Sequence, residues 1–375
     1  MTTIRTVPVL WADDLPDEGT NGCYSLDNGG SEQRVATVLD AAFGVGGPGV
    51  LCVTGDTAFE DRVCKIRDEL LPLALSLDQL SAEAKEAVCE RGTINVNGYS
   101  RGVDGHRSGF YFHPATDTPR DILPPDVEAL DDFYAPNVWP DDALPELRVR
   151  AREAAPFLVS LGRRLAAAVD THCQHAVCGY QHGTLQRLIK APAASNHKCR
   201  LILYHDYVDE AQRSSAKGMW APPHKDTGLL TALLPAVFFD VTDGTRLTAC
   251  PDPEVGLYVR DARSGVVAQI RAPPEVGQCV FFQLGEALQV VSGGLLHATE
   301  HCVRGPPRPL AGYERATLAI FLQPHAHEEL PLPEGTSFAN VANRACDGLF
   351  RMFLLYQPKD ATGINFMHFC RREGF

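Results

Sequence analysis

The chain has 375 residues, of which 45% are hydrophobic and 22% are charged. A chain of this length can bury a full core, and the composition is that of a globular protein rather than a disordered one. The formal net charge of -13 argues against broad binding to nucleic acid or anionic lipid, since those surfaces recruit basic patches. It leaves room for a small anionic ligand held by one or two arginines.

The sequence carries no signal for export or for a membrane. Its start, "MTTIRTVPVLWADDLPDEG", lacks an apolar stretch after a basic segment, and no later stretch reaches the roughly 18 apolar residues that span a bilayer. We therefore expect a soluble, cytoplasmic protein. Its twelve cysteines are scattered from Cys23 to Cys370, which favours free thiols over a disulfide framework.

The first half of the chain is predicted to be mostly helical. "SEQRVATVLDAAF", at 31–43, repeats apolar residues with helical spacing and offers Ser31 as an N-cap. A second helical stretch covers 58–77 and is interrupted near Pro72. A long third helix runs from about Leu144 to Cys173.

The glycines of "GVGGPG", from Gly44 to Gly49, formally match the dinucleotide-binding pattern G-x-G-x-x-G. That pattern works when it follows a strand and opens a helix, because the pyrophosphate lies at the helix N-terminus. Here the order is reversed, since a helix precedes the glycines and the strand "VLCVTG" follows them. We predict a helix-to-strand turn and no NAD.

A long segment at 91–125 is rich in Gly, Pro, Asp and Arg and is predicted to be an irregular connection. Loops of this length inside compact domains are often functional. If the segment covers a binding site, the candidate substrate contacts in it are Tyr99, Arg101, Arg107 and Tyr111. Packing or capping of the loop is the alternative for each of them.

After about Lys198 the pattern changes to short β-branched or aromatic runs separated by turns such as "TDGT", "DARSG" and "PPEVG". Repeated short strands of this kind predict an antiparallel sandwich or barrel. A last helical segment follows at 340–358. We therefore predict an α+β protein with a mixed N-terminal region at 1–197, a β core at 198–325 and a helical tail at 326–375.

The triplet His224, Lys225, Asp226 precedes a hydrophobic run, "TGLLTALL". In a strand, residues two apart point to the same face, so an imidazole and a carboxylate would project to one side. A facial metal triad needs one more ligand, usually a histidine from a distant strand, and leaves positions open for other ligands. These two residues alone leave a metal site and a polar surface equally open.

Several histidines are candidates for the third ligand. His297 and His301 are expected to share a strand and to face the same side of it. His325 and His327, in "QPHAHEEL", follow the last predicted strand beside two glutamates, where a solvated loop is the favoured interpretation.

Four motifs in order give the sequence a family resemblance. They are "HKDTGLLTALLP", "GLYVRDARSGVVAQI", "CVFFQLGEALQVVSGGLLHATEHCVRG" and "YERATLAIFLQP". Together they resemble the isopenicillin N synthase-like family of Fe(II)- and 2-oxoglutarate-dependent dioxygenases, over roughly the second half of the chain. Weaker similarities precede them in "VPVLW", "GVLCVTG" and "NVWP". The resemblance implies a double-stranded β-helix, or jelly roll, with a metal inside one end.

Carried over residue by residue, the resemblance makes His224, Asp226 and His301 the iron ligands, and it adds no catalytic residue beyond them. "ATEHCV" selects His301, which leaves His297 as a candidate pocket residue. Arg315 and Thr317, in "ERATL", match the pair that holds the distal carboxylate of 2-oxoglutarate, a role that suits the fork of a guanidinium. Tyr204 matches a tyrosine that also contacts this cosubstrate, although the residues around it depart from the family's N-Y-Y-P.

The resemblance implies Fe(II), 2-oxoglutarate as cosubstrate, and O2. It implies an oxidoreductase that oxidises, in the first place by hydroxylation, a small organic substrate with release of succinate and CO2. Two alternatives stay open: an Fe(II) oxidase of the same fold that does not use 2-oxoglutarate, and a non-catalytic metal- or ligand-binding jelly-roll protein. Metabolites, peptides and hormone-like molecules are all open as substrates, and so is the oligomeric state, for which a monomer is one option.

Overall fold

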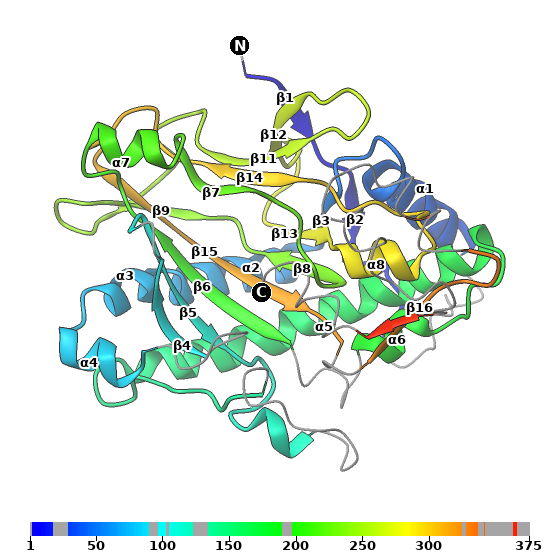
Figure 1. The fold of residues 1–375 in the computed structure, drawn as a ribbon, viewed down its shortest axis with the longest axis horizontal. Helices are drawn as coiled ribbons and strands as arrows, with labels where there is room; N and C mark the ends of the chain where they lie inside the picture. Colours follow the sequence, from blue (N-terminus) through cyan, green and yellow to red (C-terminus); the bar gives the residue numbers. More distant parts are fainter. Residues whose placement is uncertain are drawn as a thin grey trace.

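The computed structural model describes residues 2–17, 29–89, 97–102, 105–122, 134–189, 197–324, 328–336, 341 and 363–365. Figure 1 shows β-sheets in the upper and central parts of the molecule, with long helices packed against the large sheet. The helices are α1 (Gly29–Phe43), α2 (Thr57–Leu70), α3 (Pro72–Asp78), α4 (Ala82–Ala87), α5 (Pro145–Ala176), α6 (Thr184–Ile189), α7 (Glu210–Ser215) and α8 (Glu286–Val291). Short 3-10 helices are η1 (Ala12–Asp14) and η2 (Pro119–Ile122).

The small sheet has the strand order β1, β12, β11, β14, β7. Its strands are β1 (Ile4–Thr6), β12 (Val267–Arg271), β11 (Gly256–Arg260), β14 (His301–Arg304) and β7 (Met219–His224). All pairs are antiparallel except β1 with β12. The register of β14 on β7 places His301 directly opposite His224.

The large sheet has the order β2, β3, β13, β8, β15, β6, β5, β4, and β9 continues along β15 with β10 at its side. Its strands are β2 (Val9–Trp11), β3 (Val50–Thr54), β13 (Val280–Leu284), β8 (Leu230–Leu233), β15 (Tyr313–Leu322), β6 (Lys198–Tyr204), β5 (Arg107–Phe112), β4 (Gly98–Arg101), β9 (Val237–Asp240) and β10 (Arg246–Leu247). A separate pair joins β16 (Glu329–Pro331) to β17 (Gly363–Asn365).

The chain alternates between the two sheets, and this alternation defines a jelly roll. It passes from β6 in the large sheet to β7 in the small one, returns for β8 and β9, and crosses again for β11 and β12. It then places β13, β14 and β15 alternately in the large, small and large sheets. Two sheets connected in this way face each other, and the predicted jelly-roll core is confirmed.

Helices α1, α3 and α5 pack against the large sheet (Figure 1). Outward-facing Leu201 and Leu318 belong to the same buried apolar cluster as Leu158 and Leu165 of α5. Alternate residues of the same strands therefore point inward, because successive side chains of a strand face opposite sides. Among the described residues, no helix combines the length and the hydropathy that crossing a bilayer requires.

The predicted interruption between α2 and α3 at Pro72 is confirmed, and so is the turn at Gly44–Gly49, which connects α1 to β3. The irregular connection at 91–125 is wrong in part, because β4 and β5 form a hairpin that extends the large sheet. Ser31 lies inside α1 rather than at its N-cap, and its hydroxyl donates to the Asp14 carboxylate at 3.0 Å.

Two further expectations about strands need correction. His297 does not share a strand with His301, because β14 begins at His301 and His297 lies on the segment between α8 and β14. Asp226 lies just past the end of β7, where the chain leaves the ladder and its carbonyl accepts from the Glu286 N–H at 2.8 Å. The predicted helix at 340–358, apart from residue 341, and His325 and His327 lie outside the described residues.

Candidate metal centre and cavity

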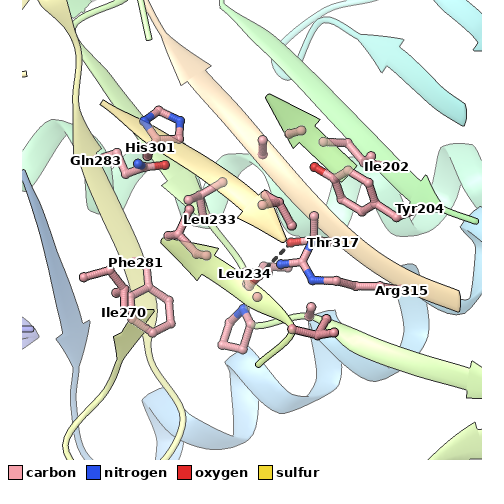
Figure 2. Close-up of a pocket in the computed structure, with 18 of the residues that line it drawn as sticks. Ile202, Tyr204, Leu233, Leu234, Ile270, Phe281, Gln283, His301, Arg315 and Thr317 are labelled. Carbon is pink, nitrogen blue, oxygen red and sulfur yellow. Dashed lines mark hydrogen bonds between the residues drawn. The ribbon is translucent and has the colours of Figure 1, made fainter. Parts of the chain in front are cut away.

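A cavity of about 550 Å³ lies between the two sheets and is lined by their inward-facing residues. Its walls include Ile202, Leu233 and Phe281 as apolar side chains, and the candidate metal ligands and Arg315 as polar ones. Figure 2 shows His301 on one side of this cavity and the group of Tyr204, Arg315 and Thr317 on the other. The cavity thus joins the two predicted functional groups in one space.

His224, Asp226 and His301 come together at the cavity. Each offers one ligand atom, and these atoms lie within 4.8 Å of one another. The Nε2 atoms of both histidines are 3.8 Å from Oδ1 of Asp226, and the two imidazole rings are 4.3 Å apart between centroids. The register of β14 on β7 explains the closeness of the histidines, which face each other across the ladder.

Hydrogen bonds on the far side of each ligand aim its free atom at the common centre. Nδ1 of His224 lies 2.8 Å from the carbonyl of Pro222, and Nδ1 of His301 lies 3.2 Å from the carbonyl of Thr299. A carbonyl only accepts, so each Nδ1 carries the proton and each Nε2 keeps a lone pair for a metal. Asp226 Oδ2 accepts from the Thr231 hydroxyl at 2.6 Å, which leaves Oδ1 for the same centre.

Burial supports the same charge state. It lowers the pKa of His301 to about 4, although the nearby Asp226 carboxylate opposes this shift. A neutral imidazole is the form that binds metal, and at neutral pH His301 is in that form. Two imidazoles and one carboxylate with open positions are the donor set typical of non-haem Fe(II), so the residues present fit this ion. The His224 side chain is 44% exposed, which opens the centre to solvent.

Thr231 is a positioning residue for this centre. Its hydroxyl is buried beside Asp226, and we expect Thr231→Val, which keeps the shape and removes the donor, to weaken Fe(II) affinity roughly 10- to 100-fold. Anaerobic Fe(II) titration of both proteins measures this change. Thr231→Ser keeps the hydroxyl and is expected to restore most of the affinity; an Fe(II) affinity of Thr231→Val equal to that of the unmodified chain would show that the hydroxyl does not orient Asp226.

Arg315, on β15, is half-buried in the wall of the cavity and has no acidic partner among the described residues. Burial lowers its pKa, and the nearby Tyr204 opposes the shift. The guanidinium lies 5.2 Å from the centroid of the Tyr204 ring, and its Nη1 is buried without a hydrogen-bond partner. Such a group is costly to bury alone, so a carboxylate is the natural complement for it.

Thr317 and Tyr204 lie beside Arg315. In the structure, the Thr317 hydroxyl and the Tyr204 ring also contact other residues of the chain. The Thr317 hydroxyl donates to the carbonyl of Leu234 at 2.9 Å, which is the dashed line in Figure 2. A bound carboxylate would compete with this carbonyl for the proton. Tyr204 is stacked on Trp220 with 5.5 Å between the ring centroids, so its ring is held in place from one side.

The structure places one of the other predicted pocket residues in the cavity wall and four of them elsewhere. Arg107 lines the cavity, whereas Tyr99, Arg101, Tyr111 and His297 are not among its lining residues. The Tyr99 hydroxyl donates to Asp78 at 2.7 Å, and Arg101 is exposed at the end of β4. The amide of His297 donates to the Phe43 carbonyl at 2.8 Å, beside α1. Substrate contact by any of them stays a prediction.

Several lining residues that alternate with residues of the core were not predicted from the sequence. Arg200 precedes Ile202 and Tyr204 by the period of two, and all three line the cavity. Thr231 and Phe321 are likewise inward-facing positions of their strands. The sequence shows that residues alternate between the two faces of each strand. It does not show which face lines the cavity, and the structure does so by placing helices on the opposite face of the large sheet.

No protein-family model and no curated protein sequence matches the chain. Solved structures do. A 2OG-Fe(II) oxygenase family protein from Caulobacter crescentus superposes with a TM-score of 0.63 at 19% identity, covering 100% of this chain and 99% of that one. A full-length protein from Neurospora crassa, solved in complex with alpha-KG and thymine, gives 0.60 at 14%, covering 98% and 96%. The rice dioxygenase for auxin oxidation gives 0.57 at 19%, covering 97% and 94%.

The first of these neighbours is a 2OG-Fe(II) oxygenase family protein, the second binds alpha-KG and the third is a dioxygenase, and all three match along the whole chain rather than its second half alone. The chain therefore has the fold of 2OG-Fe(II) oxygenase structures. At these identities the likeness concerns the fold, so the activity has to be argued from the residues of the site.

Proposed function

We propose that the protein is a non-haem Fe(II)- and 2-oxoglutarate-dependent oxygenase that oxidises, in the first place by hydroxylation, a small organic substrate. The observation that carries the proposal is the convergence of His224, Asp226 and His301 on one point of a cavity whose opposite wall holds Arg315. A metal donor set and a separate cation for a carboxylate are what an iron- and 2-oxo-acid-dependent reaction needs in one space.

In this proposal the three ligands hold Fe(II), and Arg315 with Thr317 and Tyr204 binds the carboxylate of 2-oxoglutarate far from the metal. Bound iron supplies the activation of O2 and the oxidation chemistry. The chain's own contribution would be to direct Nε2 of both histidines and Oδ1 of Asp226 toward the centre, and to present apolar walls that orient the substrate. The cavity volume of about 550 Å³ suits a small molecule.

The proposal is tested with purified protein in two stages. Adding 2-oxoglutarate to the Fe(II) protein without oxygen is expected to produce the visible charge-transfer band of a bound 2-oxo acid. With oxygen, ascorbate and a broad panel of substrates, succinate is expected to form in an iron-dependent manner. Neither band nor succinate, in protein that retains Fe(II), would contradict the proposal.

The same measurements separate the two alternatives. An oxidase that does not use 2-oxoglutarate would bind Fe(II) and consume O2 with its substrate, yet give no band when 2-oxoglutarate is titrated. A non-catalytic binding protein would show iron or ligand binding and no turnover with any member of the panel.

A further inference from the structure

The inner face of the large sheet is organised in rows of side chains that lie opposite one another across the strands. Leu233, Ala319, Arg200 and Tyr111 form one row, because the registers place Ala319 opposite both Leu233 and Arg200, and Arg200 opposite Tyr111. The same registers define a row that contains Thr231 and Phe321, and a row that contains Phe238, Arg315, Tyr204 and Arg107.

These rows place Arg200 between the two functional groups of the cavity. Its row is two residues along the strands from the row of Thr231, the residue bonded to Asp226, which is about 7 Å. It is four residues from the row of Arg315, about 13 Å. Each guanidinium lies over a tyrosine ring of its own row, Tyr111 for Arg200 and Tyr204 for Arg315, so the two arginines define two separate cationic positions.

The residues beside Arg200 on the two neighbouring strands leave room for its side chain and fix the position of its guanidinium. A Cβ atom at Gly109 would lie 3.1 Å from Nε of Arg200, tighter than usual, so glycine at this position makes space for the guanidinium. Ala319 on the other side is small. The guanidinium lies 4.9 Å from the centroid of the Tyr111 ring, a cation–π contact that fixes its plane.

No residue that the structure describes forms an ion pair or hydrogen bond with the Arg200 side chain, and its Nε is buried without a partner. The arrangement repeats that of Arg315, another cavity arginine placed over a tyrosine ring. A guanidinium in a cavity wall with its N–H groups unused is prepared for a planar anion. The apolar side chains beside it, Ile202, Leu233 and Phe321, suit a ligand whose remaining part is apolar.

We propose that Arg200 binds the carboxylate of the substrate, and that the substrate class is therefore organic carboxylates with an apolar body. This inference rests on the proposed function, since it assigns Arg315 to the cosubstrate and Arg200 to the substrate. The overall charge of -13 repels anions, so a local cation is required to bring an acid into the cavity. Arg200 acts as a specificity-determining residue, and the apolar wall directs the body of the acid toward the metal side.

The test uses probes in matched pairs: phenylacetate, cyclohexylacetate and octanoate, each beside its primary amide. Binding is measured without oxygen in two ways, by the change in the charge-transfer band of the Fe(II) and 2-oxoglutarate complex and by calorimetry on the metal-free protein. We expect acids to bind at least tenfold more tightly than their amides. Arg200→Gln is expected to weaken the acids roughly 10- to 100-fold and leave the amides unchanged.

The control is Arg308→Gln, which removes the same charge from an exposed position between β14 and β15 and is expected to leave the preference for acids intact. Arg200→Lys keeps the charge without the fork and is expected to give an intermediate loss. Amides that bind as well as acids, an unchanged preference in Arg200→Gln, or no acid bound in the whole panel would each overturn the inference. A missing band in the unmodified chain before any probe is added would instead contradict the proposed function, and the calorimetric arm still decides the role of Arg200.

Discussion

Replacing His224 by alanine is expected to remove Fe(II) binding at micromolar concentrations. His224 contributes one of three donor atoms, and the remaining pair, His301 and Asp226, would hold the ion from one side only. Loss of a residue that merely orients a ligand weakens metal binding about 10- to 100-fold, so loss of the ligand itself should exceed about 100-fold. Iron content after anaerobic desalting, together with an Fe(II) titration, measures the effect.

The side chain of His224 is 44% exposed, which makes this substitution a clean test. Removing an exposed ring costs little packing, so the variant should fold and its thermal unfolding should be close to that of the unmodified metal-free chain. His175→Ala is the matched control, because His175 is an exposed histidine of α5 that does not line the cavity. Iron retention by His224→Ala equal to that of the control would remove His224 from the metal centre.

The candidate metal centre could be predicted from the sequence because its ligands lie in short local motifs. The spacing of His224 and Asp226 places both on one side of the chain even though the strand stops between them. The partner histidine could not be chosen from spacing, since His297 and His301 were equivalent on a predicted strand. The resemblance of "ATEHCV" selected His301, and the fold supplies a physical reason for the choice: β14 begins there and sets His301 opposite His224.

Features that depend on the register between strands could not be predicted from local motifs. The hairpin of β4 and β5 follows from pairing with β6, and its Gly- and Asp-rich sequence resembles a loop. Arg200 belongs to the cavity because β5 and β15 place Tyr111 and Ala319 beside it. A sequence gives the alternation along one strand, but the neighbours across strands come from long-range pairing that local propensity does not encode.

Replacing Arg315 by methionine is expected to raise the Kd for 2-oxoglutarate roughly 100-fold, because removing one partner of a charge pair in the cavity leaves the other charge unpaired. Nη1 of its guanidinium is buried without a hydrogen-bond partner, and without a ligand Arg315 pairs with no acidic residue among those that the structure describes. Methionine fills a similar space without a charge. A titration of 2-oxoglutarate into the Fe(II) protein, followed by the visible band, measures the loss of affinity while Fe(II) binding itself stays unchanged.

Stability distinguishes a ligand-binding role for Arg315 from a structural one. Partial burial of an unpaired charge costs free energy, so Arg315→Met should leave the thermal unfolding temperature of the ligand-free protein unchanged or raise it. In the unmodified chain, 2-oxoglutarate with Fe(II) should raise that temperature, and in the variant this rise should largely disappear. A variant that unfolds at a lower temperature without ligand yet binds 2-oxoglutarate normally would show that Arg315 supports the barrel end and that another residue anchors the cosubstrate.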